Sequence, residues 1–266
     1  TSVGIRLNPN ITVKTHKKIS TGGKHDKFGL GYEDCINLCK KINTFKNLKL
    51  QGLSVHIGSQ ITDIRPFKKV LSVMDKVINK TKINFKFIDL GGGIGIPYSE
   101  KERKINLKQY AKLVNKFLKN KKTQIVFEPG RFIAGSTSIL ISKVIYIKKS
   151  NNKNFIILDA GMNNLMRPAL YDAYHKIIPL KKNNKQILKN VEFVGPICES
   201  SDKFLNKKKF PKIKEGDYIA ITDVGAYGMS LTSNYNTRPI IAEIMVSGSK
   251  HKLIKKRQSL ESLINN

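Results

Sequence analysis

Short apolar runs alternate with longer amphipathic segments in the first half of the sequence. The runs have the length of strands, and the segments between them carry apolar residues at the three- and four-residue spacing of helices. The expected strands are residues 5–7, 53–57, 85–90 and 124–127, and the expected helices are residues 32–42, 67–78 and 107–118. Repeated strand–helix units of this kind predict a parallel sheet with right-handed crossovers.

The pattern changes near residue 136, where strand-like runs follow one another without long helices between them. These runs are residues 139–147, 155–158, 191–194, 218–222 and 240–246. They predict an antiparallel β domain, with a solvated loop at residues 181–190. A closing helix is expected to contain Leu253, Ile254, Leu260 and Leu263. The sequence thus predicts a partial (β/α) barrel over residues 1–135 and a β domain over residues 136–266.

The number of strands in the first half favours part of a larger barrel. A closed (β/α)8 barrel needs eight parallel strands, twice the number expected here. The sequence opens on Thr1 with a strand directly after it, so we expect it to begin inside a domain. The predicted fold class is α/β plus β: the C-terminal half of a (β/α)8 TIM barrel, followed by an antiparallel β-barrel or sandwich. An open, flavodoxin-like sheet is the alternative.

The charge of the chain changes this picture little. A net charge of +30 would ordinarily indicate nucleic acid or an anionic membrane as partner. Only seven of the 49 basic residues are arginine, the residue preferred for bidentate recognition of phosphates and bases, and the lysines are spread along the chain. An A/T-biased coding sequence explains the abundance of Lys, Asn and Ile. We therefore expect no nucleic-acid partner, and no membrane partner because no apolar run approaches the roughly 18 residues of a membrane helix.

Glycine-rich and polar runs follow three of the strands expected in the first half. His56 is followed by Gly58 and Ser59, small residues that leave room for a planar ligand or a phosphate. The next strand ends in Gly91-Gly92-Gly93, whose backbone N–H groups suit a phosphate. The last ends in Glu128-Pro129-Gly130-Arg131, where the apolar strand favours a buried carboxylate and an arginine in one pocket. Because carboxyl ends of parallel strands meet at one edge, these runs predict a single site.

Three features of the second half also predict chemistry. Cys198 stands beside Glu199 after an apolar strand, a polar setting that favours a reactive thiol. Arg167 precedes Tyr171 by four residues, and Tyr227 lies in a glycine-flanked turn where its hydroxyl can reach a phosphate.

The remaining cysteines point to no such chemistry. Cys35 and Cys39 lie one helical turn apart, with no further ligand at metal spacing, so we expect packing residues and no metal. Three cysteines are too few for a disulfide framework, which indicates a reducing cytoplasm.

Together, these runs resemble the diaminopimelate decarboxylases. These are pyridoxal 5'-phosphate (PLP) enzymes of the alanine-racemase-like fold type III, related to the class-II ornithine, lysine and arginine decarboxylases. The resemblance covers nearly all 266 residues in the right order. It implies a PLP-binding (β/α)8 barrel followed by a β domain, and decarboxylation of meso-2,6-diaminopimelate to L-lysine and CO2. It also implies a homodimer.

The resemblance assigns roles around the cofactor. It places His56 against one face of the PLP ring and Glu128 at the pyridine nitrogen, where a carboxylate keeps that nitrogen protonated. The residues that it places around the phosphate are Ser59, Gly92, Gly93, Gly130, Arg131 and Tyr227.

Roles toward the substrate follow from the same resemblance. Glu199 is expected to meet the distal ammonium, and Cys198 to return a proton to the substrate carbon after CO2 leaves. Both are expected to serve the partner subunit's site. Arg131, Arg167 and Tyr171 are expected to clamp the substrate's carboxylate, and Tyr227 is expected to contact the substrate as well as the phosphate.

One departure and three alternatives accompany the resemblance. No lysine of this sequence matches the family's PLP-anchoring lysine, which lies early in the barrel, so we expect the sequence to be inactive alone. A related PLP decarboxylase acting on ornithine, arginine or carboxynorspermidine is the first alternative. The others are a PLP-carrying or regulatory homologue without decarboxylase activity and a basic nucleic-acid-binding module, which predicts steeply salt-dependent binding.

Overall fold

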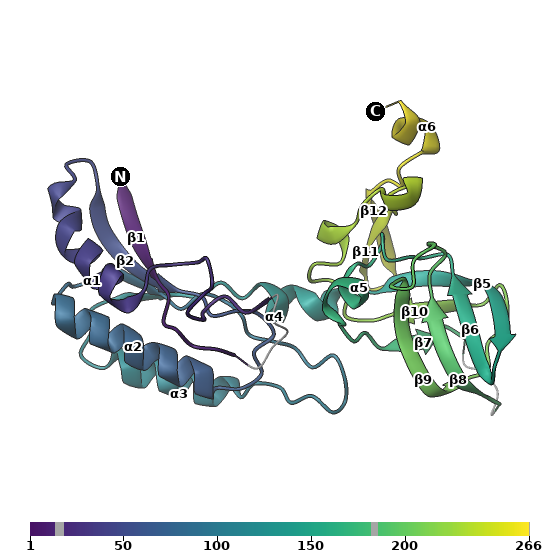
Figure 1. Cartoon of the computed structure of the whole chain (residues 1–266), viewed down its shortest axis with the longest axis horizontal. Helices are drawn as coiled ribbons and strands as arrows, with labels where there is room; N and C mark the ends of the chain where they lie inside the picture. Colours follow the sequence, from purple (N-terminus) through teal and green to yellow (C-terminus); the bar gives the residue numbers. More distant parts are fainter. Residues whose placement is uncertain (14–18, 182–185, 266) are drawn as a thin grey trace. The chain divides into compact units, whose positions relative to one another are not determined.

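The computed structural model describes residues 1–13, 19–181 and 186–265, and the chain divides into two compact units. The first unit is Thr1–Ala134 and the second unit is Gly135–Asn266. Figure 1 shows helices beside a sheet in the first unit and mainly strands in the second.

The first unit is built on a four-stranded parallel sheet with strand order β1-β2-β3-β4. Its strands are β1 (Ser2–Leu7), β2 (Lys49–Val55), β3 (Phe87–Asp89) and β4 (Gln124–Val126). The helices are α1 (Tyr32–Lys41), α2 (Arg65–Thr81), α3 (Leu107–Leu118) and the short α4 (Gly130–Ala134), with a 3-10 turn, η2 (Ile42–Thr44). Each strand pairs with the next strand in the chain, as the sequence pattern predicted.

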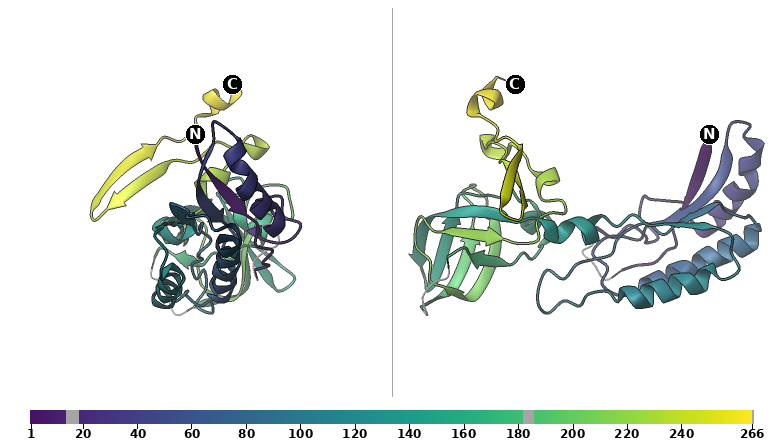
Figure 2. Two further views of the ribbon diagram at one scale, coloured as in Figure 1. Left: turned by 90° about the vertical axis from the view of Figure 1, so that its left-hand side faces the viewer. Right: turned by 180° about the vertical axis from the view of Figure 1, so that it is seen from behind.

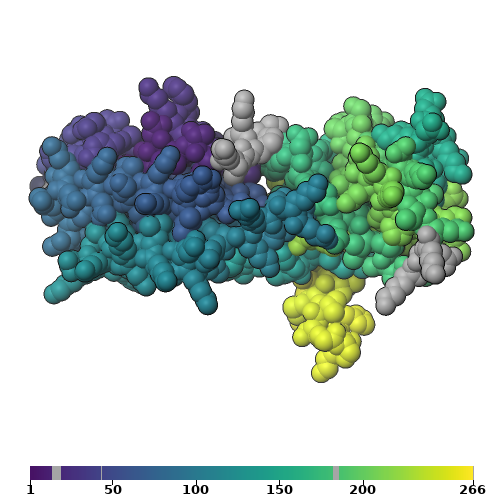
Figure 3. Space-filling view, turned by 90° about the horizontal axis from the view of Figure 1, so that it is seen from below, coloured from purple at the N-terminus to yellow at the C-terminus, as the bar shows by residue number. Residues whose placement is uncertain are grey.

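Helical spacing of apolar residues explains how the helices cover the sheet. In α2, Val70, Met74 and Val77 recur at three- and four-residue intervals and are buried. Burying each such side chain stabilises the fold by about 1.5–3 kcal/mol. Helices α2 and α3 lie side by side, and their outward side chains form part of the face of this unit in Figure 3.

The second unit contains a six-stranded sheet with order β7-β10-β5-β6-β8-β9 and a separate hairpin of β11 and β12 (Figure 2). Its strands are β5 (Leu140–Ser150), β6 (Lys153–Leu158), β7 (Ile177–Pro179), β8 (Ile187–Val194), β9 (Lys203–Pro211), β10 (Tyr218–Ile221), β11 (Glu243–Ser247) and β12 (Lys250–Lys255). Its helical turns are η3 (Gly135–Thr137), α5 (Arg167–Tyr171), η4 (Met229–Leu231), η5 (Tyr235–Thr237) and α6 (Leu260–Ile264).

The prediction of a wholly antiparallel second half was wrong at one pairing. Strand β6 pairs with β8 in parallel, with Asn154 opposite Val191. The chain between these strands contains α5 and β7, and this long connection returns it to the same end of the sheet, as parallel neighbours require.

Three further details differ from the sequence prediction. The expected loop at residues 181–190 lies partly outside the described residues, and Ile187–Asn190 belong to β8. Leu253 and Ile254 lie in β12 rather than in a closing helix, because a short apolar run fits strand and helix equally well. Strand β9 was missed because lysines dominate it, although Phe204 and Phe210 are buried.

Within the described residues, no helix is long and apolar enough to cross a membrane. The same residues contain no group of three or more His, Cys, Asp or Glu side chains placed to hold a metal ion.

Candidate functional site

The three predicted runs of the first unit meet beyond the carboxyl ends of β2, β3 and β4. The Gly92 N–H donates to His56 Nδ1 over 3.2 Å, and the Glu128 N–H donates to the Gly91 carbonyl over 2.9 Å. Arg131 Nε donates to Ser59 Oγ over 3.2 Å. Strand ends far apart in sequence are therefore joined at one edge of the sheet.

His56 is a neutral, oriented ring in this arrangement. Burial lowers the pKa of His56, the nearby Arg6 lowers it further, and Asp89 opposes this fall. Because Nδ1 accepts the Gly92 N–H, the ring proton is on Nε2. Arg6 also donates from Nη2 to the His56 carbonyl over 3.3 Å, which fixes the backbone at this position.

Gly92 and Gly93 are required by close packing of the backbone at this edge. Gly93 has a φ of 91°, and a Cβ atom there would lie 2.2 Å from the Gly58 carbonyl oxygen. A Cβ on Gly92 would lie 2.1 Å from the Glu128 carbonyl oxygen. In contrast, a Cβ on Gly130 would meet nothing within 4 Å, so open space lies beside this part of the edge.

Arg131 supplies a positive charge to the same edge. Its side chain is buried, and Nη1 donates to the Tyr98 hydroxyl over 2.6 Å. Tyr98 also turns its ring toward the guanidinium, with 5.8 Å between the guanidinium carbon and the ring centroid. A buried guanidinium beside hydroxyls and glycine backbone has the donor chemistry of a phosphate site. These residues therefore fit the phosphate of PLP.

The prediction that Glu128 is buried was wrong, since its side chain is exposed. The residue lies just beyond the end of β4. Its backbone is nevertheless fixed, because its N–H bonds to Gly91 and its carbonyl accepts the Gly130 N–H over 2.9 Å. The carboxylate thus projects from a rigid turn.

In the second unit, Arg167 is buried in α5 and is oriented by His175. Arg167 Nη1 lies 2.8 Å from His175 Nε2, and His175 Nδ1 lies 2.9 Å from the Thr222 carbonyl. A guanidinium only donates and a carbonyl only accepts, so His175 is neutral with its proton on Nδ1. This contact links α5 to the segment after β10, where Tyr227 lies. Tyr171, at the end of α5, is half-buried.

The loop after β8 presents Cys198 and Glu199 at the surface. Both carboxylate oxygens of Glu199 are held: the Tyr235 hydroxyl donates to Oε1, and Ser201 Oγ donates to Oε2 over 3.1 Å. The bond to Glu199 raises the pKa of Tyr235. Cys35 and Cys39 are buried, so Cys198 is the exposed cysteine of the chain.

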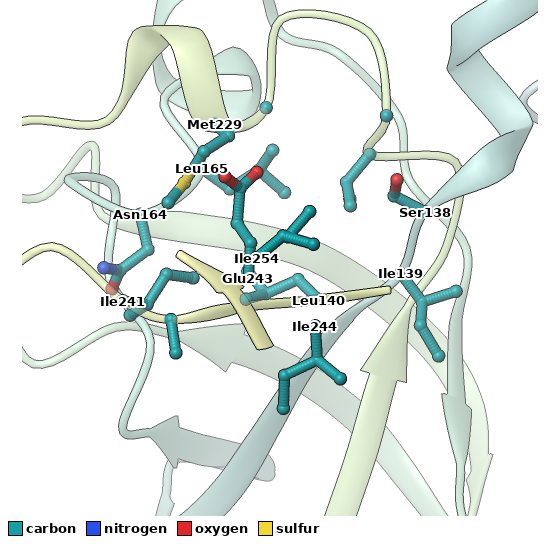
Figure 4. A pocket seen from close by; sticks show the side chains of 14 residues that line it. Ser138, Ile139, Leu140, Asn164, Leu165, Met229, Ile241, Glu243, Ile244 and Ile254 are labelled. Carbon is teal, nitrogen blue, oxygen red and sulfur yellow. The ribbon is translucent and has the colours of Figure 1, made fainter. Parts of the chain in front are cut away.

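Tyr227 is exposed in the turn after β10 and adopts a φ of 61°. A neighbouring pocket of about 180 Å³ lies between this region and the β11–β12 hairpin (Figure 4). Aliphatic side chains such as Leu165 and Ile254 dominate its lining, which also includes Glu243. None of the predicted site residues is among the described residues that line it.

Several residues at these places were missed by sequence reasoning. Tyr98 follows the glycine run by five residues, and this closeness could have suggested a place at the site. His175, Asp202 and Tyr235 were missed because each has a partner that is distant in sequence.

The parallel sheet of the first unit carries donors for a phosphate at its carboxyl edge, which indicates an α/β domain for a phosphorylated ligand, followed in the chain by a β domain. A family model described as "Pyridoxal-dependent decarboxylase, pyridoxal binding domain" matches residues 1–135, half of the chain. The chain belongs to the pyridoxal-dependent decarboxylase family.

Individual relatives agree with this assignment. The diaminopimelate decarboxylase of Zymomonas mobilis is 40% identical over 267 residues, which cover 99% of this chain and 63% of that protein. The crystal structure of diaminopimelate decarboxylase from Helicobacter pylori complexed with L-lysine has a TM-score of 0.90 at 40% identity, covering 99% of this chain and 66% of that one. A lysine decarboxylase structure from Selenomonas ruminantium shares the fold alone, with a TM-score of 0.75 at 24% identity over 90% of this chain and 61% of that one.

These comparisons confirm the predicted fold class, part of a (β/α)8 barrel followed by a β domain, over the flavodoxin-like alternative. The chain spans 63% of the length of the Zymomonas mobilis relative.

Proposed function

We propose that this chain is part of a PLP-dependent enzyme that decarboxylates meso-2,6-diaminopimelate to L-lysine and CO2. The observation that supports this most is the joined edge of the first unit, where glycines, Ser59 and the buried Arg131 match a phosphate. The 40% identity to diaminopimelate decarboxylases over nearly the whole chain supports the choice of substrate.

The residues of the first unit divide the work of holding the cofactor. Bound PLP supplies an electron sink for the charge left on the substrate when CO2 departs. Arg131, Ser59, Gly130 and the backbone of Gly92 and Gly93 would hold the phosphate. His56 lies against the ring as a neutral group. Glu128 offers its carboxylate to the pyridine nitrogen, and an anion there favours a proton on that nitrogen.

The residues of the second unit serve the substrate in this proposal. Arg167 and Tyr171 bind a substrate carboxylate, Tyr227 contacts the substrate, and Glu199 accepts the distal ammonium. Cys198 donates the proton that replaces the carboxylate. The proposed enzyme is a cytoplasmic homodimer in which Cys198 and Glu199 act in the partner subunit's site.

A substrate panel on the full-length protein tests the proposal. With PLP present, we expect meso-diaminopimelate to release CO2 faster than ornithine, arginine or carboxynorspermidine, and to yield L-lysine. CO2 release by a coupled assay and product identification by mass spectrometry measure this. Faster turnover of ornithine would replace the proposed substrate, and PLP binding without CO2 release from any of them would indicate a non-catalytic homologue.

We expect Arg131→Gln to weaken PLP binding by about 10- to 100-fold, because a hydrogen bond to a charged group contributes about 1.5–3 kcal/mol. Arg131→Lys keeps the charge without the fork of donors and should lie between wild type and Arg131→Gln. PLP titration by absorbance measures the dissociation constant, with circular dichroism to establish folding. Arg103→Gln, at an exposed arginine, is the matched control. Equal PLP affinity in all variants would remove Arg131 from the phosphate site.

A further inference from the structure

The loop that presents Cys198 and Glu199 connects β8 to β9 and spans residues 195–202. Both side chains are exposed, so burial of their own surface does not fix them. A residue that takes part in bond breaking must nevertheless be held to within a fraction of an ångström. The bonds from Tyr235 and Ser201 hold the Glu199 carboxylate but not the backbone before Cys198, which needs an anchor of its own.

Asp202 has the contacts of such an anchor. Its side chain is buried, with 2% of the residue exposed. Oδ2 accepts the Ile197 N–H over 2.8 Å, and Oδ1 accepts the Met162 N–H over 2.7 Å. One carboxylate thus joins the loop, at the residue before Cys198, to the turn that follows β6.

The backbone of Asp202 closes the loop at its base. Its carbonyl accepts the Gly195 N–H over 3.0 Å, and its own N–H donates to the Glu199 carbonyl over 3.0 Å. Gly195 also lies against the carboxylate, because a Cβ atom there would be 2.2 Å from Oδ2. The Asp202 side chain and Gly195 are therefore fitted to each other.

The charge of Asp202 suits these contacts. An ionised carboxylate is an acceptor on both oxygens, and both are used here by backbone donors. Burial raises the pKa of Asp202 and the nearby Glu199 adds to this, whereas the bonds from Ile197 and Met162 and the charge of Arg238 lower it.

We propose that Asp202 is a positioning residue that fixes the Cys198–Glu199 loop in its working geometry. The expected effect on turnover rests on the proposed function. The anchoring of the loop by Asp202 does not. Asp202→Asn is the sharpest variant, because one amide NH2 must then face a backbone N–H donor. The loop loses at least one of its two side-chain anchors while the shape of the side chain is preserved.

Asp217 offers a matched control in the same unit. It is 7% exposed, and its Oδ2 accepts the Lys214 N–H over 2.9 Å in the turn before β10. Asp217→Asn therefore makes the same chemical change at a buried, turn-closing aspartate away from Cys198.

The experiment uses the full-length protein and two readouts. Hydrogen–deuterium exchange should become at least about tenfold faster in peptides containing Met162 and Ile197 in Asp202→Asn, and unchanged there in Asp217→Asn. Turnover of meso-diaminopimelate should fall at least about tenfold in Asp202→Asn, with KM changed less than kcat and the PLP absorption spectrum unchanged. Asp202→Glu, which keeps both acceptors, serves the same measurements if Asp202→Asn does not fold, and should give smaller changes of the same kind.

The readouts separate two kinds of failure. Unchanged exchange, or faster exchange with normal turnover, overturns the positioning role and leaves the proposed function intact. If the wild-type protein does not decarboxylate diaminopimelate, the proposed function fails, and the exchange data still decide whether Asp202 anchors the loop. Loss of PLP together with faster exchange throughout the protein overturns the positioning role in favour of a general structural one.

Discussion

Cys198→Ala in the full-length protein is expected to lower kcat for diaminopimelate by about 10²- to 10⁴-fold, the range that a general acid contributes. The reason is that the exposed thiol is the group proposed to deliver the proton that replaces CO2. PLP content, measured by absorbance, should be unchanged because Cys198 is not proposed to contact the cofactor phosphate. KM should change less than kcat, because the thiol is proposed to act only in the chemical step, after the substrate has bound.

The neighbouring residue provides the control for this prediction. Ser200 is exposed in the same loop, so Ser200→Ala makes a similarly small change there and leaves the thiol in place. Normal turnover is expected for that variant. A Cys198→Ala enzyme within a few-fold of wild type would mean that another group supplies the proton.

Glu128→Gln is expected to lower kcat by at least about 100-fold, or about 2.7 kcal/mol in activation free energy, with the fold and PLP binding retained. The amide has nearly the shape of the carboxylate but lacks its charge. It therefore does not favour a proton on the pyridine nitrogen, and the cofactor becomes a weaker electron sink. Steady-state kinetics and the absorption spectrum of bound PLP measure both consequences.

Glu33→Gln is the control for charge removal, because Glu33 is an exposed carboxylate in the first turn of α1. An unimpaired Glu128→Gln enzyme would contradict the role proposed for Glu128. Loss of PLP from that variant would instead make Glu128 chiefly a binding residue.

The joined edge of the first unit could be predicted because parallel strands place their carboxyl ends together. That single rule brought His56, Gly92 and Glu128 to one place from runs far apart in the sequence. The exposure of Glu128 could not be predicted in the same way. The burial of a residue just beyond a strand depends on which elements lie beside that strand, and the hydrophobic pattern of the strand does not contain this information.

The anchoring contacts of the second unit were beyond sequence reasoning for a related reason. His175 could be noticed as a rare residue, but its partner Thr222 lies 47 residues away. Asp202 reaches Met162 across 40 residues. The first contact depends on the pairing of β7 with β10, and the second on the parallel pairing of β6 with β8, which the apolar runs alone did not reveal.

That parallel pairing also affects the order in which contacts form during folding, because each contact costs chain entropy when it closes a loop. The β5–β6 and β8–β9 pairs each join strands that are close in sequence, so closing them costs little chain entropy. Pairing β6 with β8 closes a much longer loop and is favoured once both hairpins exist. The bond from Met162 to Asp202 crosses this long-range junction, so the Cys198 loop gains its second anchor only when the two halves of the sheet have met.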